Sequence, residues 1–367
     1  MAKPNGFPMT GKRSRGSTAA DPADLLHDGP GTAREVGLRY VSETEPGCSR
    51  SRHGKGFGYR DSEGRPLRAK EELARIRALA IPPAWTDVWI CRDARGHIQA
   101  TGRDARGRKQ YRYHADWRSL RDQTKYGQMI AFGEALPALR ARLEQDLRQR
   151  GLPRDKVLAV AVQLLDLTRI RVGNTEYARD NASFGLTTLR DEHVDVDGTR
   201  IRFHFRGKSG VHHEVAVSDR RLARIVRQMV DLPGEELFQY SDEEGLPHPI
   251  GSADVNDYLR GLTGADFSAK DFRTWGGTVL AVRHLLAQPV EAAVQATRQN
   301  LLQAIDQVAR ALGNTRALCR KCYVHPAVIE AFLAGVLHES TAKLTKPLAG
   351  LSEEEALTLH FLQTRAQ

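Results

Sequence analysis

Hydrophobic residues recur at helical spacing through most of the chain. Leu136, Leu139, Leu143 and Leu147 fall on one face of a helix, and residues 157–167 are apolar enough to form a buried helix. Similar patterns predict helices at residues 219–231, 252–262, 270–286, 290–312, 326–337 and 353–364. The chain from residue 124 to residue 367 is therefore predicted to form one mainly helical domain.

A short stretch inside this region follows another pattern. Between residues 186 and 217 the apolar period changes to two, which is typical of strands. Asp197-Gly198 predicts a tight turn before a strand at 201–205, and a turn at 207–210 leads into a strand at 213–217. The helical domain is predicted to contain a small antiparallel sheet.

Residues 34–123 are made of short segments separated by Gly, Pro and Asp. Residues 88–91 and 97–101 flank a turn at 93–96 and predict a β-hairpin, and residues 71–80 predict a short helix. This pattern indicates a small β-rich domain. Residues 1–33 lack periodic apolar content and predict a disordered basic leader. The predicted fold class is α+β, with a β-rich N-terminal domain before the helical one.

The charge of the chain narrows the class of partner. Its 55 basic and 45 acidic residues give a net charge of +10, which favours a polyanion such as nucleic acid. No segment approaches the roughly 18 apolar residues of a membrane-spanning helix, and no signal-peptide core is evident. We expect a cytoplasmic protein with no membrane association.

The four cysteines are too few for a disulfide framework in 367 residues. Cys319 and Cys322 have CxxC spacing, but with His325 they supply only three candidate ligands, whereas structural zinc takes four. We therefore expect no metal site at this position.

Two further cofactor motifs fail on their spacing. Gly207-Lys208-Ser209 resembles the end of a phosphate-binding loop, but Arg202 stands where the first glycine belongs. Asp195 and Asp197 resemble a metal-binding pair, yet they precede a predicted hairpin turn, where acidic residues are common. We expect neither ATP nor a metal cofactor, so chemistry on a phosphodiester would depend on cationic side chains.

Such cationic residues occur in order along the helical domain. Arg171 follows the buried helix, Lys208 lies at the tip of a glycine-flanked hairpin, and Arg273 lies near a helix start within residues 270–275. Asn314 and Tyr323 follow near the end of the chain. Each is unremarkable alone, and the order and local context make the set specific.

In these residues the chain resembles the type IB DNA topoisomerases, in the short poxvirus-like form found in bacteria. The resemblance extends from about residue 35 to the C-terminus. It implies the tyrosine recombinase/topoisomerase IB-like fold, and relaxation of supercoiled double-stranded DNA without ATP or metal. It also implies a nucleoid-associated protein, which we expect to be a monomer.

The resemblance also implies a role for each residue of the set. Tyr323 would attack the scissile phosphorus and leave a 3′-phosphotyrosyl link and a free 5′-hydroxyl. Arg171 and Arg273 would clamp the non-bridging oxygens, and Lys208 would protonate the departing 5′-oxygen. Asn314 stands where many members have histidine, and it would stabilise an oxygen.

A second set of residues is expected to bind DNA. A basic segment near the end of the β-rich domain resembles the DNA-contacting end of the family's N-terminal domain. After Arg171, Tyr177 matches a family residue that faces DNA, and Asn174 stands where some members have lysine. The set consists of Arg108, Lys109, Gln110, Tyr111, Tyr113, Asn174 and Tyr177.

Two alternatives remain. Tyrosine site-specific recombinases share the chemistry, but they usually have a His-x-x-Arg box where this chain has Lys270 and Arg273, and a helical N-terminal domain. A non-catalytic DNA-binding relative would retain the fold without the reaction.

Overall fold

The computed structural model describes residues 29–54, 56–105, 107–289, 293–341 and 349–366. The chain divides into two compact units after Thr124. Most of the predicted leader lies outside the described residues, but its last residues belong to helix α2, Gly29–Glu35, in which Ala33 is buried against Leu38 and Trp117. Residues 29–33 are therefore helical, and their prediction as disordered was wrong.

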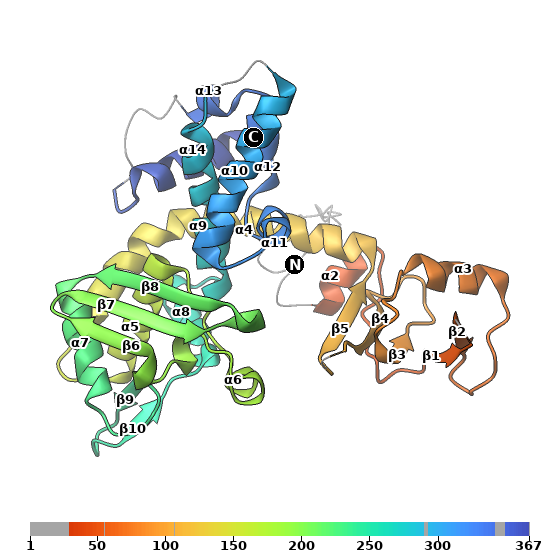
Figure 1. Ribbon diagram of the computed structural model, residues 1–367, viewed down its shortest axis with the longest axis horizontal. Coiled ribbons are helices and arrows are strands. Elements are labelled where there is room, and N and C mark those ends of the chain that lie inside the picture. The colour runs from red at the N-terminus through yellow and green to blue at the C-terminus, as the bar shows by residue number, and fades with distance from the viewer. Residues whose placement is uncertain (1–28, 55, 106, 290–292, 342–348, 367) are drawn as a thin grey trace, which may run out of the picture. The chain divides into compact units, whose positions relative to one another are not determined.

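The first unit is built on a five-stranded antiparallel sheet of order β2-β1-β3-β4-β5 (Figure 1). Its strands are β1 Cys48–His53, β2 Gly56–Arg60, β3 Thr86–Ile90, β4 Ile98–Arg103 and β5 Lys109–Tyr113. β3 and β4 form the hairpin predicted around residues 93–96, and α3, Lys70–Ala78, is the predicted short helix. The β-rich character of this unit agrees with the predicted fold class.

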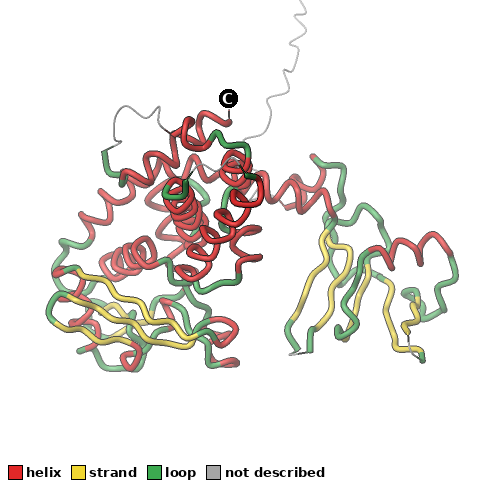
Figure 2. Tube along the Cα trace, turned by 45° about the horizontal axis from the view of Figure 1, so that its top comes forward, coloured by secondary structure: helices red, strands yellow, loops and turns green. Residues whose placement is uncertain are grey.

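The second unit is mainly helical, as predicted (Figure 2). Its helices are α5 Arg154–Thr168, α6 Thr175–Asn181, α7 Arg220–Val230, α8 Ser252–Thr263, α9 Ala269–Leu286, α10 Val294–Leu312, α11 Arg316–Cys322, α12 Pro326–Leu333, α13 Leu337–Thr341 and α14 Glu353–Ala366. α4, Ala115–Asp146, begins earlier than predicted. The predicted helix at 326–337 ends earlier, at Leu333, and α13 begins at Leu337, because Gly335 between them adopts a left-handed φ of +74°.

The predicted sheet of the second unit has strand order β6-β7-β8. Its strands are β6 Val194–Asp197, β7 Arg200–Arg206 and β8 His212–Ser218. Ile201, Phe203 and Phe205 of β7 are buried, whereas Arg202 and His204 between them are exposed. This alternation produces the period of two in the sequence, because successive strand side chains point to opposite faces. A separate two-stranded sheet consists of β9 Gln239–Ser241 and β10 Pro247–Pro249.

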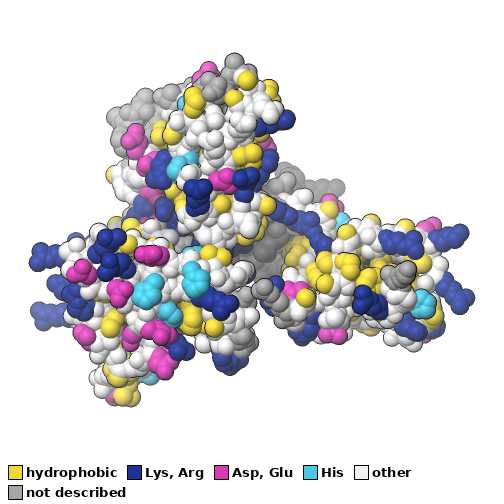
Figure 3. Space-filling model, viewed as in Figure 1, with side chains coloured by type: hydrophobic (Ala, Val, Ile, Leu, Met, Phe, Trp, Pro, Cys, Tyr) yellow, Lys and Arg dark blue, Asp and Glu magenta, His cyan; other side chains and the backbone are white. Residues whose placement is uncertain are grey.

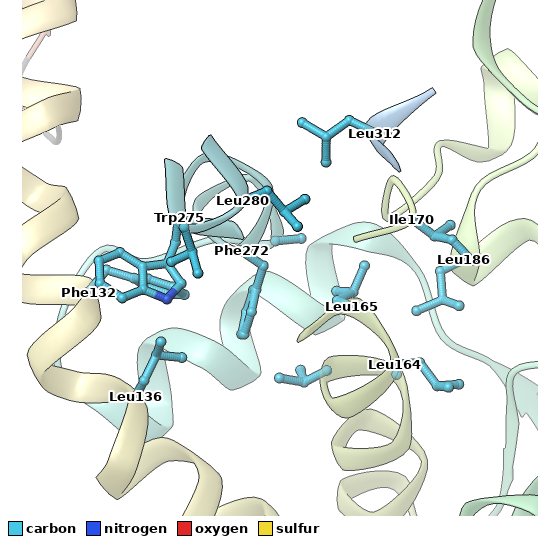
Figure 4. Close-up of a cluster of buried hydrophobic side chains, with 14 of the residues drawn as sticks. Phe132, Leu136, Leu164, Leu165, Ile170, Leu186, Phe272, Trp275, Leu280 and Leu312 are labelled. Carbon is cyan, nitrogen blue, oxygen red and sulfur yellow. The ribbon is translucent and has the colours of Figure 1, made fainter. Parts of the chain in front are cut away.

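The core of the second unit surrounds α9. Figure 4 shows Phe132 of α4 beside Trp275 and Phe272 of α9, with Leu164 and Leu165 of α5 on the other side. The Phe132 ring meets the Phe272 ring edge-on, with 5.0 Å between centroids. Because α9 is packed on several sides, the residues along it occupy fixed positions. None of the helices in the described ranges is long and apolar enough to cross a membrane.

A partly buried ionic cluster ties three helices together. Arg140 of α4 donates to Asp166 of α5 at 2.8 Å and to Glu355 of α14 at 2.7 Å. Trp275 Nε1 donates to the same Glu355 carboxylate at 3.3 Å. Burial opposes ionisation of Glu355, but the hydrogen bonds and charge of Arg140 outweigh it, so the pKa of this carboxyl lies below its ordinary value.

We predict that Arg140→Ala lowers the free energy of unfolding by about 3 kcal/mol, because it leaves two carboxylates poorly solvated and unpaired. Folding lowers the pKa of Glu355, so the cluster stabilises the wild type at pH values above the ordinary pKa of a carboxyl group. This stabilisation is lost as the pH falls through the pKa of Glu355 in the folded protein. Denaturant unfolding at pH 7 and pH 4 measures both effects. Arg142→Ala, on the same helix, removes an ion pair of 3.6 Å to Asp146, which keeps its hydrogen bond from the Tyr258 hydroxyl, so this variant should cost less than about 1 kcal/mol. Equal losses for the two variants would contradict the prediction.

Candidate active site

A pocket of about 550 Å³ lies where the loop after α5, the β7–β8 hairpin, α9 and the end of α11 meet. Arg171, Lys208, Arg273 and Tyr323 all line it, and Asn314 is bonded to one of them. The described residues therefore bring together the complete predicted catalytic set from five separate segments.

Arg171 lies in the loop that follows α5. The helix ends because Arg169 adopts the left-handed conformation, with φ 58° and ψ 21°. The loop is held by a hydrogen bond from the Leu186 N–H to the Arg171 carbonyl at 2.7 Å. A Cβ on Gly185 would lie only 2.6 Å from that carbonyl, so the close approach requires glycine.

Arg273 on α9 is 4% exposed and is fixed through its guanidinium. One Nη donates to the Arg169 carbonyl, and the other donates to the Leu312 carbonyl at 2.9 Å. The guanidinium carbon lies 5.2 Å from the centre of the Tyr323 ring. Burial and then the charge of Arg171 lower the pKa of Arg273, but an arginine remains cationic at neutral pH.

Asn314 follows the end of α10, which Gly313 caps in the left-handed conformation with φ 58°. The Asn314 side-chain carbonyl accepts a hydrogen bond from Arg171 Nη2 at 2.5 Å. Its Nδ2 is buried and has no partner among the described residues. A buried amide group without a partner is unusual and marks a position where an acceptor would be stabilised.

Tyr323 is the C-terminal cap of α11, a helix that the sequence pattern did not predict. Its N–H donates to the Cys319 carbonyl at 3.0 Å, and its carbonyl accepts from the Thr278 hydroxyl at 3.2 Å. Behind it, a Cβ on Gly277 would lie 2.7 Å from that carbonyl and 3.0 Å from the tyrosine Cβ. The backbone of Tyr323 is therefore seated directly on α9, next to Arg273.

Lys208 differs from the other members because it is exposed. It begins the short turn Lys208–Gly210 between β7 and β8, in which Ser209 and Gly210 have φ of 66° and 77°. The turn is closed at its base by a hydrogen bond from the Gly207 N–H to the Val211 carbonyl at 2.8 Å. Lys208 is thus carried into the pocket on a turn whose tip is open to solvent.

Comparisons with known proteins identify the family of the chain. Residues 114–346 match the family model described as the catalytic core of eukaryotic DNA topoisomerase I. Residues 56–104 match the model of the N-terminal domain of bacterial DNA topoisomerase IB. The chain belongs to the type IB DNA topoisomerases.

Individual relatives agree with the family match. The DNA topoisomerase 1B of Acanthamoeba polyphaga mimivirus is 30% identical over 293 residues, which cover 78% of this chain and 87% of that protein. The DNA topoisomerase 1B of vaccinia virus strain Western Reserve is 21% identical over 260 residues, which cover 70% and 80%. The enzyme is therefore an isomerase that acts on DNA.

The basic segment predicted to bind DNA consists of β5 of the first unit and Arg108 just before it. Tyr111 and Tyr113 are 42% and 39% exposed, and their rings stack with 5.8 Å between centroids. The Gln110 amide donates to Asp104 at 3.0 Å, and Lys109 pairs with Glu43. Arg108 pairs with the same Asp104 at 2.7 Å. The strand thus presents two aromatic rings, with the polar side chains held by acidic neighbours.

Other predicted positions vary in how they relate to the pocket. Asn174 is exposed and lines the pocket, and Tyr177 lies in α6, but its side chain is outside the described part of the structure. Lys270 also lines the pocket, although the sequence analysis noted it only as part of a motif. His213 is half-buried on β8, the strand that follows the Lys208 turn. It was missed, because nothing in its sequence context distinguishes it from a solvated strand residue.

The cysteines that precede Tyr323 are not arranged as metal ligands. Cys319 is fully buried, and burial raises the pKa of its thiol to about 11, so it is protonated at neutral pH. His325 instead accepts a hydrogen bond from the Ala327 N–H at 3.1 Å and caps α12. Across the described residues, no group of three or more His, Cys, Asp or Glu side chains could hold a metal ion.

We predict that Gly277→Ala lowers the free energy of unfolding by about 1–3 kcal/mol, because the new methyl group would overlap the backbone of Tyr323. Gly261→Ala is the matched control: this glycine lies in α8, and a Cβ added to it would have no heavy atom within 4 Å, so alanine should stabilise by about 0.5–1 kcal/mol. Denaturant unfolding distinguishes them. Similar changes in both variants would show that Tyr323 is not packed against α9 as described.

Proposed function

We propose that this topoisomerase relaxes supercoiled duplex DNA by transient cleavage of one strand through a covalent link to Tyr323, without ATP or metal. The observation that carries the proposal is the charge of the pocket. Its described lining includes the cations Arg171, Lys208, Lys270 and Arg273 beside the tyrosine, and no carboxylate. Such a pocket suits a phosphodiester, because the cations can offset the charge that grows in the transition state.

In the proposed reaction the Tyr323 oxygen bonds to phosphorus as the bond from phosphorus to the 5′-oxygen breaks. Phenols ordinarily ionise only at about pH 10, so the hydroxyl proton must pass to solvent water during the attack. The product is a 3′-phosphotyrosyl ester and a 5′-hydroxyl. Because this ester retains the energy of the broken bond, the 5′-hydroxyl can reverse the step without a nucleotide. Rotation of the free strand between the two steps would release supercoils.

Arg273 and Arg171 are proposed to clamp the non-bridging oxygens. Arg273 is held by two backbone carbonyls at the ends of α5 and α10, so little reorganisation is needed when charge develops. Arg171 is held by the Asn314 side-chain carbonyl. Guanidinium groups fixed in this way can donate to phosphate oxygens in a defined direction.

Asn314 is proposed to have two roles. Its carbonyl orients Arg171, and this bond turns the amide so that Nδ2 remains available to donate to a phosphate oxygen. The buried Nδ2 without a described partner supports this second role. An amide cannot transfer a proton at neutral pH, so proton transfer is left to another residue.

Lys208 is proposed to protonate the departing 5′-oxygen. It is a cationic donor lining the pocket, and its exposed turn allows it to reach a leaving group that moves as the bond breaks. We further propose that β5 and the residues Asn174 and Tyr177 bind the duplex, and that the enzyme acts as a monomer. Figure 3 shows Lys and Arg side chains on the visible surfaces of both units, in keeping with a polyanionic partner.

We predict that the pure protein relaxes supercoiled plasmid in EDTA without ATP, and that Tyr323→Phe abolishes relaxation and the covalent protein–DNA adduct while DNA binding is retained. Agarose gels and denaturing gels of labelled DNA measure these products. Tyr240→Phe removes a tyrosine hydroxyl from β9, outside the pocket, and should retain full activity. A wild type that fails to relax the plasmid would favour a non-catalytic relative, and an active Tyr323→Phe would exclude Tyr323 as the nucleophile.

We predict that Lys208→Ala slows single-turnover cleavage by about 10²–10⁴-fold, the range for loss of a general acid. A substrate with sulfur in place of the bridging 5′-oxygen should restore most of the rate, because a thiolate leaves without a proton. Cleavage of the two substrates by wild type and variant is compared on labelled duplexes. A variant that remains equally slow on the sulfur substrate would remove Lys208 from this role.

A further inference from the structure

His213 on β8 lies between the turn that carries Lys208 and the segment that leads into Asn314. Its imidazole lies against Gly207, the residue before Lys208, and against Gly313, the residue before Asn314. A Cβ on Gly207 would lie 2.6 Å from the ring carbon Cδ2, and a Cβ on Gly313 would lie 2.3 Å from Cε1. Both contacts are too close for any residue other than glycine.

The direction of the ring is set by the sheet. His213 pairs with Phe205 across the β7–β8 ladder, and the two rings stack with 5.0 Å between centroids and 12° between planes. Phe205 is buried at 6% exposure, so the stack is anchored in the core of the second unit. The imidazole is therefore fixed on one side by the sheet before it meets the two glycines.

The ring is also electrostatically suited to this place. Burial lowers the pKa of His213, and the positive charges of Arg171 and Arg273 lower it further, so the imidazole is neutral at neutral pH. A neutral ring can fill the space beside two cations without adding a third charge. No described residue makes a hydrogen bond with the ring, so its contacts are those of packing.

These contacts matter because Lys208 has little else to define its position. Within the described ranges, the backbone hydrogen bonds of the turn that carries it are local, from Gly207 to Val211 and from Gly210 to Gly207. The His213 ring is what connects the base of this turn to Gly313, and so to the chain that leads into Asn314 and Tyr323.

We propose that His213 is a positioning residue that spaces the Lys208 turn from the Gly313–Asn314 segment, and thereby places the Lys208 ammonium against the leaving 5′-oxygen. This inference rests on the proposed function of Lys208. A residue that acts through the general acid should matter only when the leaving group needs a proton, and this property separates it from a residue that merely supports the fold.

The test is single-turnover cleavage by full-length variants on the two substrates with bridging 5′-oxygen or 5′-sulfur. His213→Ala and the volume-retaining His213→Leu should cleave the oxygen substrate about 10–100-fold more slowly, the range expected for a displacement of about 1 Å. On the sulfur substrate both should come within about threefold of wild type if only proton delivery is impaired. His213→Phe, which retains a planar ring, should restore cleavage of the oxygen substrate.

Two controls complete the design. His212→Ala changes the exposed neighbour on the opposite face of β8 and should cleave both substrates at the wild-type rate. The double variant Lys208→Ala/His213→Leu should be no slower than Lys208→Ala alone, because both changes affect the same proton transfer.

Several outcomes would overturn the inference. These are an equal loss on both substrates, a wild-type rate in His213→Leu, or multiplied losses in the double variant. If His213→Ala unfolds, His213→Leu and His213→Phe decide the question. Failure of the proposed function has a different signature, since the wild type itself would then leave both substrates intact, and the inference would fall with it.

Discussion

The rest of the site depends on the hydrogen bonds that hold the buried guanidinium of Arg273. A charge at 4% exposure is tolerated only where hydrogen bonds replace water, and here two backbone carbonyls do so. One carbonyl belongs to Arg169, whose left-handed conformation ends α5, and the other belongs to Leu312 at the last turn of α10. Helix C-termini carry partial negative charge, so they are favourable partners for a cation. Arg273 thus brings the ends of two helices to α9, and Arg171 and Asn314 are the residues that follow shortly after those ends.

The meeting of the α5 and α10 ends at α9 also brings neighbouring segments of the chain very close together. Gly277 allows Tyr323 to lie on α9, and Gly207 and Gly313 allow the His213 ring to lie between the Lys208 turn and the segment that leads into Asn314. These glycines are needed for proximity, and a methyl group at any of them would overlap a neighbour. The result is a site in which Arg171, Arg273, Asn314 and Tyr323 are held by packed backbone, whereas Lys208 alone is carried on an exposed turn. In the proposed mechanism this division is appropriate, because the phosphate must be held still while the leaving oxygen moves.

Much of this architecture could be predicted from the sequence, because the large helices and the β6–β8 sheet have strong periodic patterns. The weaker elements were missed for physical reasons. α11 spans only Arg316–Cys322 and exposes most of its side chains, so it lacks an apolar face, although it positions Tyr323. The early start of α4 was hidden by charged residues around 115–123. Of the site, the catalytic set followed from its resemblance to a family, since no periodicity identifies it. His213 carried no signal in the sequence, because it contacts Phe205, Gly207 and Gly313, all of which lie outside its own strand.

The presence of asparagine at position 314 is best understood together with His213. Histidine at 314 would place a titratable ring between Arg171 and the phosphate, in a pocket whose lining already includes four cationic side chains. Asparagine offers an acceptor for Arg171 and a donor for an oxygen, and its charge does not change with pH. The imidazole beside this segment is instead His213, which burial and the neighbouring arginines keep neutral. In the proposed enzyme, proton transfer is thereby assigned to Tyr323 and Lys208, and neither Asn314 nor His213 takes part in it.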